Sequence, residues 1–223
     1  MDATVVTTTV ATKAPPAAER VYAHVKSGVL DRIYEGGTLL TEGDLADAVG
    51  VSRTPVREAL LRLEAEGLLK LYPKKGALVL PVSAQEIADV VETRLLVEQH
   101  AVAKVVGAVP PPLIARLEES LAEQRGHAAA GDLAAFAVAD RCFHAEIVRA
   151  AGNRILAQLY DQLRDRQLRM GVATMHAEPS RVAKNIAEHT EILDALRAGA
   201  ARTAADVVDR HISWVKVLAR GES

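Results

Sequence analysis

The sequence predicts a mainly α-helical fold: an N-terminal winged helix-turn-helix with a two-stranded wing, followed by an all-helical, six-helix bundle. Apolar residues recur at three- and four-residue intervals along most of the 223 residues, which is the period of a helix with one buried face. Hydrophobic residues make up 49% of the chain and aromatic residues only 3%, so the core must consist of Ala, Leu and Val, of which Ala and Leu favour helices. The turn Pro73–Gly76 lies between two short apolar runs and indicates one β-hairpin.

The winged domain is expected over residues 17–82. Its first helix begins near Ala17 and ends at the Gly36–Gly37 pair. Thr41 and Asp44 form a short capping box for a second helix, which ends at Gly50.

A third helix and the wing complete this domain. Ser52 caps the third helix, which tolerates Pro55 in its first turn and runs to Gly67. Two strands are expected over residues 68–72 and 77–80.

The second domain is expected over residues 83–223 and contains helices alone. Gly and Pro residues mark the ends of six periodic stretches. The expected limits are Ser83 to Gly107, Pro112 to Gly131, Asp132 to Gly152, Asn153 to Gly171, Pro179 to Gly199, and a last helix that carries His211 and Trp214.

The composition predicts a cytoplasmic protein. Residues 1–16 are rich in Thr, Ala and Pro and lack the basic start of a secretion signal, so we expect a disordered tail. No apolar run approaches the length of a membrane span. The single cysteine, Cys142, excludes an internal disulfide and fits a reducing compartment. The net charge of −2 means that a nucleic-acid partner would have to bind a local basic patch.

Such a patch is predicted on the third helix and the wing. The first turn of that helix, Ser52–Arg53–Thr54, offers free backbone N–H groups to a phosphate, and Arg53 and Arg57 share one face. Their guanidinium groups could reach guanine edges in a major groove. The wing adds Lys74, Lys75 and Gly76. The charge by itself favours a solvated basic face; the order of the elements reverses this and favours DNA.

Four ionisable residues occupy apolar helical stripes of the second domain. Asp140 and His144 share one face at i, i+4, His189 lies on a second stripe, and His211 lies on a third that continues to Leu218. Buried imidazoles and carboxylates are costly unless they have partners, and one divalent cation would partner all four. This ligand set predicts one metal ion per chain, Zn²⁺ in the first place, with Ni²⁺ or Mn²⁺ as alternatives. The other interpretation is that the four groups hydrogen-bond one another.

Two further residues are candidates for binding an effector. Arg94 shares the inward stripe of its helix with Glu98, so it could either offer a bidentate fork to a carboxylate or form an i, i+4 pair with Glu98. Asn185 lies one turn before His189 and could face the same chamber or the helix surface. Glu188 neighbours His189 but should face away from it, so no general base is evident and no catalytic residue is assigned.

The motif around the third helix resembles the DNA-binding signature of GntR-type bacterial transcription regulators. The resemblance extends from Gly43 to Gly76 and centres on Val51-Ser52-Arg53-Thr54-Pro55-Val56-Arg57-Glu58-Ala59-Leu60, continued by residues 62–68. It implies that Arg53, Thr54 and Arg57 read or clamp operator DNA and that the wing around Gly76 enters the minor groove. Family members usually have an Arg where this chain has Gly43, and the departure leaves the operator sequence open.

The helical remainder is similar to the effector-sensing FCD-type domain of the FadR subfamily, and its expected six helices resemble the VanR-like branch. The resemblance implies that Asp140 and the three histidines hold a divalent ion and that a small carboxylate completes its coordination. It also favours Arg94 as an effector ligand.

The sequence therefore predicts a ligand-responsive bacterial transcription regulator, not an enzyme. We expect it to act as a repressor: a homodimer that binds operator double-stranded DNA and a small organic acid, with a hinge near residues 79–84. A metal-dependent hydrolase with an accessory DNA-binding module is the alternative, and a metal-storage bundle is a third. The operator, the effector, the physiological metal and the regulated genes are not determined by the sequence.

Overall fold

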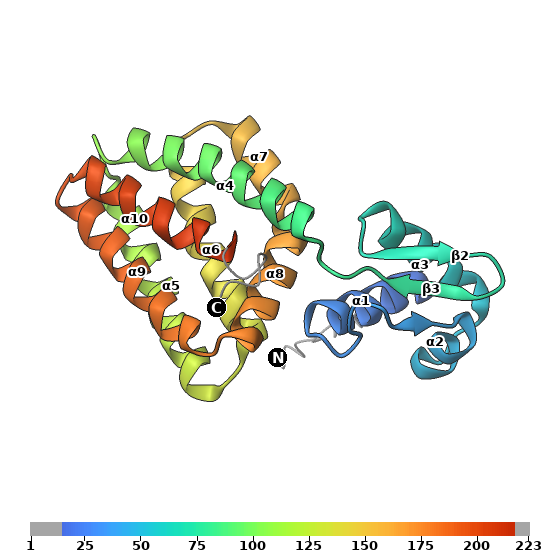
Figure 1. Cartoon of the computed structure of the whole chain (residues 1–223). Helices are drawn as coiled ribbons and strands as arrows, with labels where there is room; N and C mark the ends of the chain where they lie inside the picture. The colour runs from blue at the N-terminus through green and yellow to red at the C-terminus, as the bar shows by residue number, and fades with distance from the viewer. Residues whose placement is uncertain (1–14, 217–223) are drawn as a thin grey trace, which may run out of the picture. The chain divides into compact units, whose positions relative to one another are not determined.

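The computed structural model describes residues 15–216, shown as the coloured ribbon in Figure 1. Most of the predicted tail, residues 1–14, and Leu218 of the last predicted stripe lie outside the described residues. Two compact units are present. The first comprises the chain up to Ser27 with Gly37–Leu80, and the second comprises Gly28–Gly36 with the chain from Pro81 onward. The sequence-based boundary between Val82 and Ser83 stays a prediction.

The first unit is a winged helix-turn-helix. Thr41 caps α2 by accepting a hydrogen bond from the backbone N–H of Asp44, as the capping box predicts, and α2 and α3 pack against each other. Ser52 occupies the N-cap position of α3 but makes no side-chain capping bond. The elements in chain order are α1 (Ala17–Leu30), β1 (Leu39–Leu40), α2 (Glu42–Val49), α3 (Arg53–Ala65), β2 (Leu69–Tyr72) and β3 (Gly76–Val79).

The sheet has one strand more than the expected two-stranded wing. Its order is β1-β3-β2, with both pairings antiparallel and Leu39 opposite Leu78. The two residues of β1 are too few to produce an alternating pattern, so only the tertiary pairing with β3 identifies them as a strand.

The wing depends on an unusual backbone at its tip. Gly76 has a φ of 122°, and a Cβ atom there would lie 2.2 Å from the carbonyl oxygen of Leu40, so glycine is required where β3 passes β1. Lys74 has a φ of 64°, a left-handed conformation that costs an L-residue roughly 1–2 kcal/mol.

The second unit contains seven helices within the described residues, not the expected six. Where one helix was predicted after Asn153, the structure has α7 and α8, which meet at Leu163. The N–H of Leu163 bonds to the carbonyl of Tyr160 and not to that of residue 159, which tightens the last turn of α7. No Gly or Pro marks this break, so no local pattern predicts it. The helices are α4 (Ala84–Val105), α5 (Pro111–Ala130), α6 (Leu133–Ala150), α7 (Arg154–Gln162), α8 (Arg164–Ala177), α9 (Ser180–Arg197) and α10 (Ala201–Ser213).

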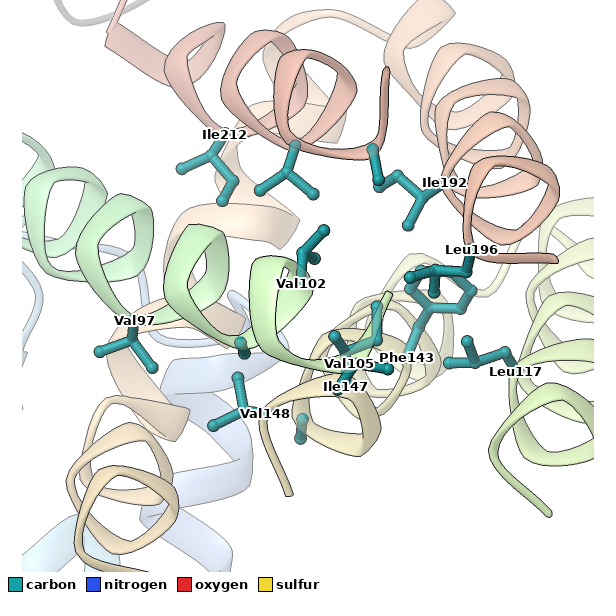
Figure 2. Close-up of a cluster of buried hydrophobic side chains, with 14 of the residues drawn as sticks. Val97, Val102, Val105, Leu117, Phe143, Ile147, Val148, Ile192, Leu196 and Ile212 are labelled. Carbon is teal, nitrogen blue, oxygen red and sulfur yellow. The ribbon is translucent and has the colours of Figure 1, made fainter. Parts of the chain in front are cut away.

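Helix α6 is the central helix of this unit, because it packs against α4, α5, α7 and α8. Helices α9 and α10 pack against each other and cover α5 and α4 respectively. Figure 2 shows the core that results, to which five helices each contribute one of the labelled residues Val102, Leu117, Phe143, Ile192 and Ile212. The metal-type ligands of α6, α9 and α10 lie on the helix faces that this core fixes.

Candidate metal centre and nucleic-acid interface

The four predicted metal ligands come together inside the second unit. One ligand atom from each of Asp140, His144, His189 and His211 lies within 4.8 Å of the others. The three histidines are buried and Asp140 is half-buried. Helix α6 supplies Asp140 and His144 one turn apart, while α9 and α10 supply His189 and His211. The helical periodicity thus predicted the faces correctly, and the packing of three helices brings the faces together.

The three imidazole rings point their Nε2 atoms at one another. His144 Nε2 lies 3.1 Å from both His189 Nε2 and His211 Nε2, and the remaining pair is 3.3 Å apart. The corners of that triangle lie about 1.8 Å from its centre, which is shorter than a Zn–N bond of roughly 2.0–2.1 Å. The three nitrogens are therefore close enough together for His144, His189 and His211 to hold one Zn²⁺ ion between them.

The opposite nitrogen of each ring faces a hydrogen-bond acceptor. His144 Nδ1 lies 2.7 Å from Glu98 Oε2 in an ion-pair contact that lacks hydrogen-bond alignment, and His189 Nδ1 lies 2.7 Å from Gln124 Oε1. A proton on Nδ1 would leave the Nε2 lone pair of each ring directed at the other two rings. Acceptors in this position orient histidines that bind metals and raise their basicity.

His211 has two groups at its Nδ1. Glu188 Oε2 is 2.8 Å away and Arg181 Nη2 is 3.2 Å away, and Arg181 also forms an ion pair with Glu188. The carboxylate is the nearer group and is the acceptor, so the proton of His211 also lies on Nδ1. Three lone pairs then converge on one point, an arrangement that a cation stabilises.

Burial suits these groups to a cation. Burial lowers the pKa of His189 and of His211 well below 6.5, so both rings are neutral at pH 7. Burial also raises the pKa of the Asp140 carboxyl, whose Oδ1 lies 3.6 Å from His189 Nε2. A cation between them would favour the ionised carboxylate.

Glu98 connects the histidines to the candidate effector residue Arg94. Glu98 Oε1 accepts hydrogen bonds of 2.7 Å from Arg94 Nε and from the hydroxyl of Tyr160. Burial would raise the pKa of Glu98, but the charge of Arg94 reverses this shift and the pKa lies well below its usual range. The expected i, i+4 pair between Arg94 and Glu98 is thus present. It engages only Nε of Arg94, and the terminal N–H groups have no acceptor among the described residues.

Arg94 and Asp140 both line a small cavity beside the ligand cluster. Its volume is about 40 Å³, and its other walls are Ala137, Arg141, Gln167, Gly171 and Met175. Asn185 lies next to it, because its Nδ2 donates a 3.4 Å hydrogen bond to Asp140 Oδ1. The Oδ1 atom of Asn185 is buried without a hydrogen-bond partner in the described structure. The structure thus places Arg94 on the cavity wall and Asn185 against Asp140, and their role in effector binding stays a prediction.

Two residues of the site were missed from the sequence. Gln124 follows Leu117 and Leu121 on the apolar stripe of α5, so the rule that found the histidines also finds this amide. Glu188 does face away from His189, as predicted, but it reaches His211 on a different helix. That contact depends on the packing of α9 against α10, which no local pattern encodes.

The predicted DNA-contacting residues lie on one exposed surface of the first unit. Ser52, Arg53, Thr54 and Arg57 are all exposed on or next to the first turns of α3, and Lys74 and Lys75 are exposed at the wing. A concave groove joins α3 to the wing, and its lining includes Arg53, Arg57, Lys74, Lys75 and Gly76. An α-helix flanked by a basic wing suits the groove and backbone of duplex DNA.

Comparison with known proteins decides the family. Residues 17–79 match the family described as bacterial regulatory proteins, gntR family, and residues 89–213 match the FCD domain. The chain belongs to the GntR family of bacterial regulators. Regulators of this family bind operator DNA and effector ligands, which confirms the predicted class and gives the hydrolase alternative no support.

Individual relatives agree with this assignment. A transcriptional regulator from an unstable DNA locus of Streptomyces ambofaciens is 32% identical over 199 residues, which are 87% of this chain and 81% of the relative. The gluconate operon transcriptional repressor of Bacillus subtilis (strain 168) is 30% identical over 145 residues, which are 65% of this chain and 59% of the repressor.

Solved structures share the fold of this regulator. Escherichia coli McbR/YncC has a TM-score of 0.72 at 24% identity, with 94% of this chain and 99% of that chain covered. A GntR regulator from Rhodococcus sp. RHA1 has a TM-score of 0.77 at 22% identity, with coverage of 92% and 98%. Among residues 15–216, no helix combines the length and the apolar character that crossing a membrane requires.

We expect the metal-free protein to lose stability as the pH falls below about 6.5, since the unfolded chain then binds protons that buried His189 and His211 resist. Each imidazole contributes up to about 1.4 kcal/mol per pH unit. The raised pKa of Asp140 has the opposite effect on stability, because the folded chain binds a proton at this carboxyl more readily than the unfolded chain does as the pH falls. This single carboxyl opposes the effect of two imidazoles. Urea denaturation with a chelator at about pH 7.5 and pH 5.5 measures the slope. The exposed His176→Ala variant should keep the slope, and a flat profile in the wild type contradicts the expectation.

Gln124→Leu should weaken metal affinity about 10- to 100-fold, because it removes the acceptor that orients His189. His189→Ala should abolish stoichiometric binding. Competition against a chromophoric zinc chelator measures the affinity. Trp214, the only tryptophan, offers a fluorescence signal, because its ring lies 4.6 Å from Arg181 beside His211. Gln158→Leu on the surface of α7 is the control, and equal affinities for the two leucine variants would exclude a role for Gln124.

Arg57→Ala should weaken binding to specific duplex DNA by about 10- to 100-fold, the range of one bidentate base contact. Metal content should stay unchanged, because Arg57 belongs to the other unit. Fluorescence anisotropy with a duplex selected by the wild type measures the affinity. Wild-type affinity in the variant would remove Arg57 from the DNA-contacting surface.

Proposed function

We propose that this chain is a homodimeric, metal-containing transcriptional repressor that a small organic acid releases from its operator. The observation that carries the sensory part is the convergence of three Nε2 atoms, with a carboxylate or amide oxygen 2.7–2.8 Å from each Nδ1. A cluster that merely satisfied its own hydrogen bonds would place a proton between the rings. Because operator DNA lies in the cytoplasm, the protein would act there.

Zn²⁺ is the metal we propose for the site, with one ion per chain. Zn²⁺ accepts imidazole nitrogen together with carboxylate oxygen, and the short distances between the nitrogens fit its bond length. Asp140 would be the fourth protein ligand. Ni²⁺ and Mn²⁺ are the alternatives, since both accept the same ligand atoms in a six-coordinate shell.

A small carboxylate is the effector that suits the chamber. The free N–H groups of Arg94 can donate in parallel to two carboxylate oxygens, and Asn185 adds an amide. The cavity has room for about three water molecules, which restricts the ligand to a few non-hydrogen atoms in this conformation. The relative from Bacillus subtilis is named as the repressor of an operon for gluconate, itself a carboxylate, which supports this ligand class.

The operator would bind to α3 and the wing. Ser52, Arg53 and Thr54 lie at the N-terminus of α3, where backbone N–H groups are available to a phosphate, and Arg57 lies one turn further on. Lys74, Lys75 and Gly76 would contact the adjacent backbone and minor groove. Two such units in a homodimer would bind two half-sites of a pseudo-palindromic operator.

Helix α4 would connect effector binding to the release of operator DNA. It begins directly after the proposed hinge, residues 79–84, and it carries both Arg94 and Glu98. A carboxylate bound by Arg94 therefore acts on the helix to which the DNA-binding unit is joined. The effector would release the DNA only if it binds more tightly to a state whose half-site spacing fits the operator poorly.

Effector-driven release from DNA tests this function. Zinc-loaded protein is bound to a duplex that it selects from a randomised library, and acetate, lactate, citrate and gluconate are added separately. We expect at least one acid to lower the DNA affinity at least about fivefold, the lower end of typical allosteric coupling. Arg94→Gln should retain zinc and DNA binding but lose the response. Release of equal size from Arg94→Gln, or by chloride at the same ionic strength, would contradict the proposal.

A further inference from the structure

The first turn of α2 lies against Arg53 and Arg57 of α3. Glu42 accepts two hydrogen bonds of 2.8 Å from Arg57 Nε, one at each carboxylate oxygen. Next to it, a Cβ atom on Gly43 would lie 3.8 Å from Arg53 Nη2, so the guanidinium of Arg53 extends over the glycine. Glu42 and Gly43 therefore border the path of the two side chains that we assign to reading the operator.

The contact with Glu42 leaves the terminal guanidinium nitrogens of Arg57 free to contact a base. It uses Nε alone, and the terminal nitrogens, which donate in parallel to O6 and N7 of a guanine, have no partner among the described residues. The Arg57 side chain is 65% exposed, whereas Glu42 is 30% exposed. Glu42 thus holds Arg57 at its Nε atom and leaves the terminal nitrogens of the guanidinium in solvent.

A carboxylate is unfavourable on a surface that binds phosphates. Glu42 lines the same groove as Arg53, Lys74 and Lys75, where its negative charge repels the DNA backbone. Any benefit must come from holding Arg57 in one orientation, because a side chain that is already ordered loses less entropy when it meets a base. Such a benefit would raise the preference of the protein for one base pair over the others, and it would not raise the affinity for DNA of any sequence.

We propose that Glu42 is a positioning residue that aims Arg57 at one base pair, so that it sets operator specificity at the expense of non-specific affinity. The proposal rests on the DNA-binding surface described under the proposed function. It assigns Glu42 no contact with the DNA itself.

Selection from a randomised duplex library tests the proposal on the full-length, zinc-loaded protein. Five forms are compared: the wild type, Glu42→Ala, Glu42→Gln, Arg57→Ala and the control Asp47→Ala. Asp47 is an exposed acid on the same helix that does not line the groove, so its loss removes one negative charge without touching Arg57. Affinities for the wild-type-selected duplex and for a scrambled duplex give each specificity ratio, and circular dichroism confirms folding.

We expect Glu42→Ala to lose the base preference at the same position as Arg57→Ala, with a specificity ratio about tenfold below the wild type. Its affinity for the scrambled duplex should stay level or rise, most clearly at low salt. Glu42→Gln keeps one acceptor for Nε and should lie between the two. Asp47→Ala should keep the full base preference.

Two results overturn the proposal in different ways. If Arg57→Ala changes the selected sequence and Glu42→Ala does not, Glu42 has no positioning role and the DNA-binding surface stands. If Arg57→Ala also selects the wild-type sequence, Arg57 reads no base, and the assignment of Arg57 fails together with that of Glu42. A preference lost at a different position from that of Arg57→Ala likewise excludes the proposed coupling.

Discussion

The sensory unit depends on placing three unprotonated imidazole nitrogens within about 3.3 Å of one another in a buried interior. Neutral rings so close would repel one another through their lone pairs, and burial opposes their protonation. The acceptors at Nδ1 maintain this arrangement. They come from α4, α5 and α9, so three helices that supply or surround the ligands must pack correctly before the site exists.

His144 and Arg94 share Glu98, so the packing that positions the metal ligands also bears on regulation by an effector. One carboxylate lies 2.7 Å from Nδ1 of His144, accepts a hydrogen bond from the hydroxyl of Tyr160 and pairs with Arg94. A ligand that draws Arg94 towards the cavity would disturb an interaction on which a metal ligand also depends. Metal binding and effector binding would then be linked through α4, and by reciprocity each would alter the affinity for the other.

The proposed DNA-contacting surface carries acidic as well as basic side chains. Glu42 lies among its basic residues, and Lys74 occupies a left-handed backbone conformation that glycine would adopt without strain. The acid lowers the positive charge of this surface, and the left-handed backbone of Lys74 lowers the stability of the fold. They are consistent with a surface in which the direction of a few side chains matters more than the net charge, which is −2 for the whole chain.

The sequence by itself determined the helical class, the winged motif and the inward faces of Asp140, His144, His189 and His211, because helical periodicity is a local property that fixes which residues share a face. It failed where the decisive contact joins segments far apart in the chain. The strand β1, the break between α7 and α8, and the reach of Glu188 to His211 all depend on neighbours that only folding brings close. Tertiary structure alone decided that the four ligand atoms lie within 4.8 Å of one another, since side-chain direction is set within a helix but distance is set between helices.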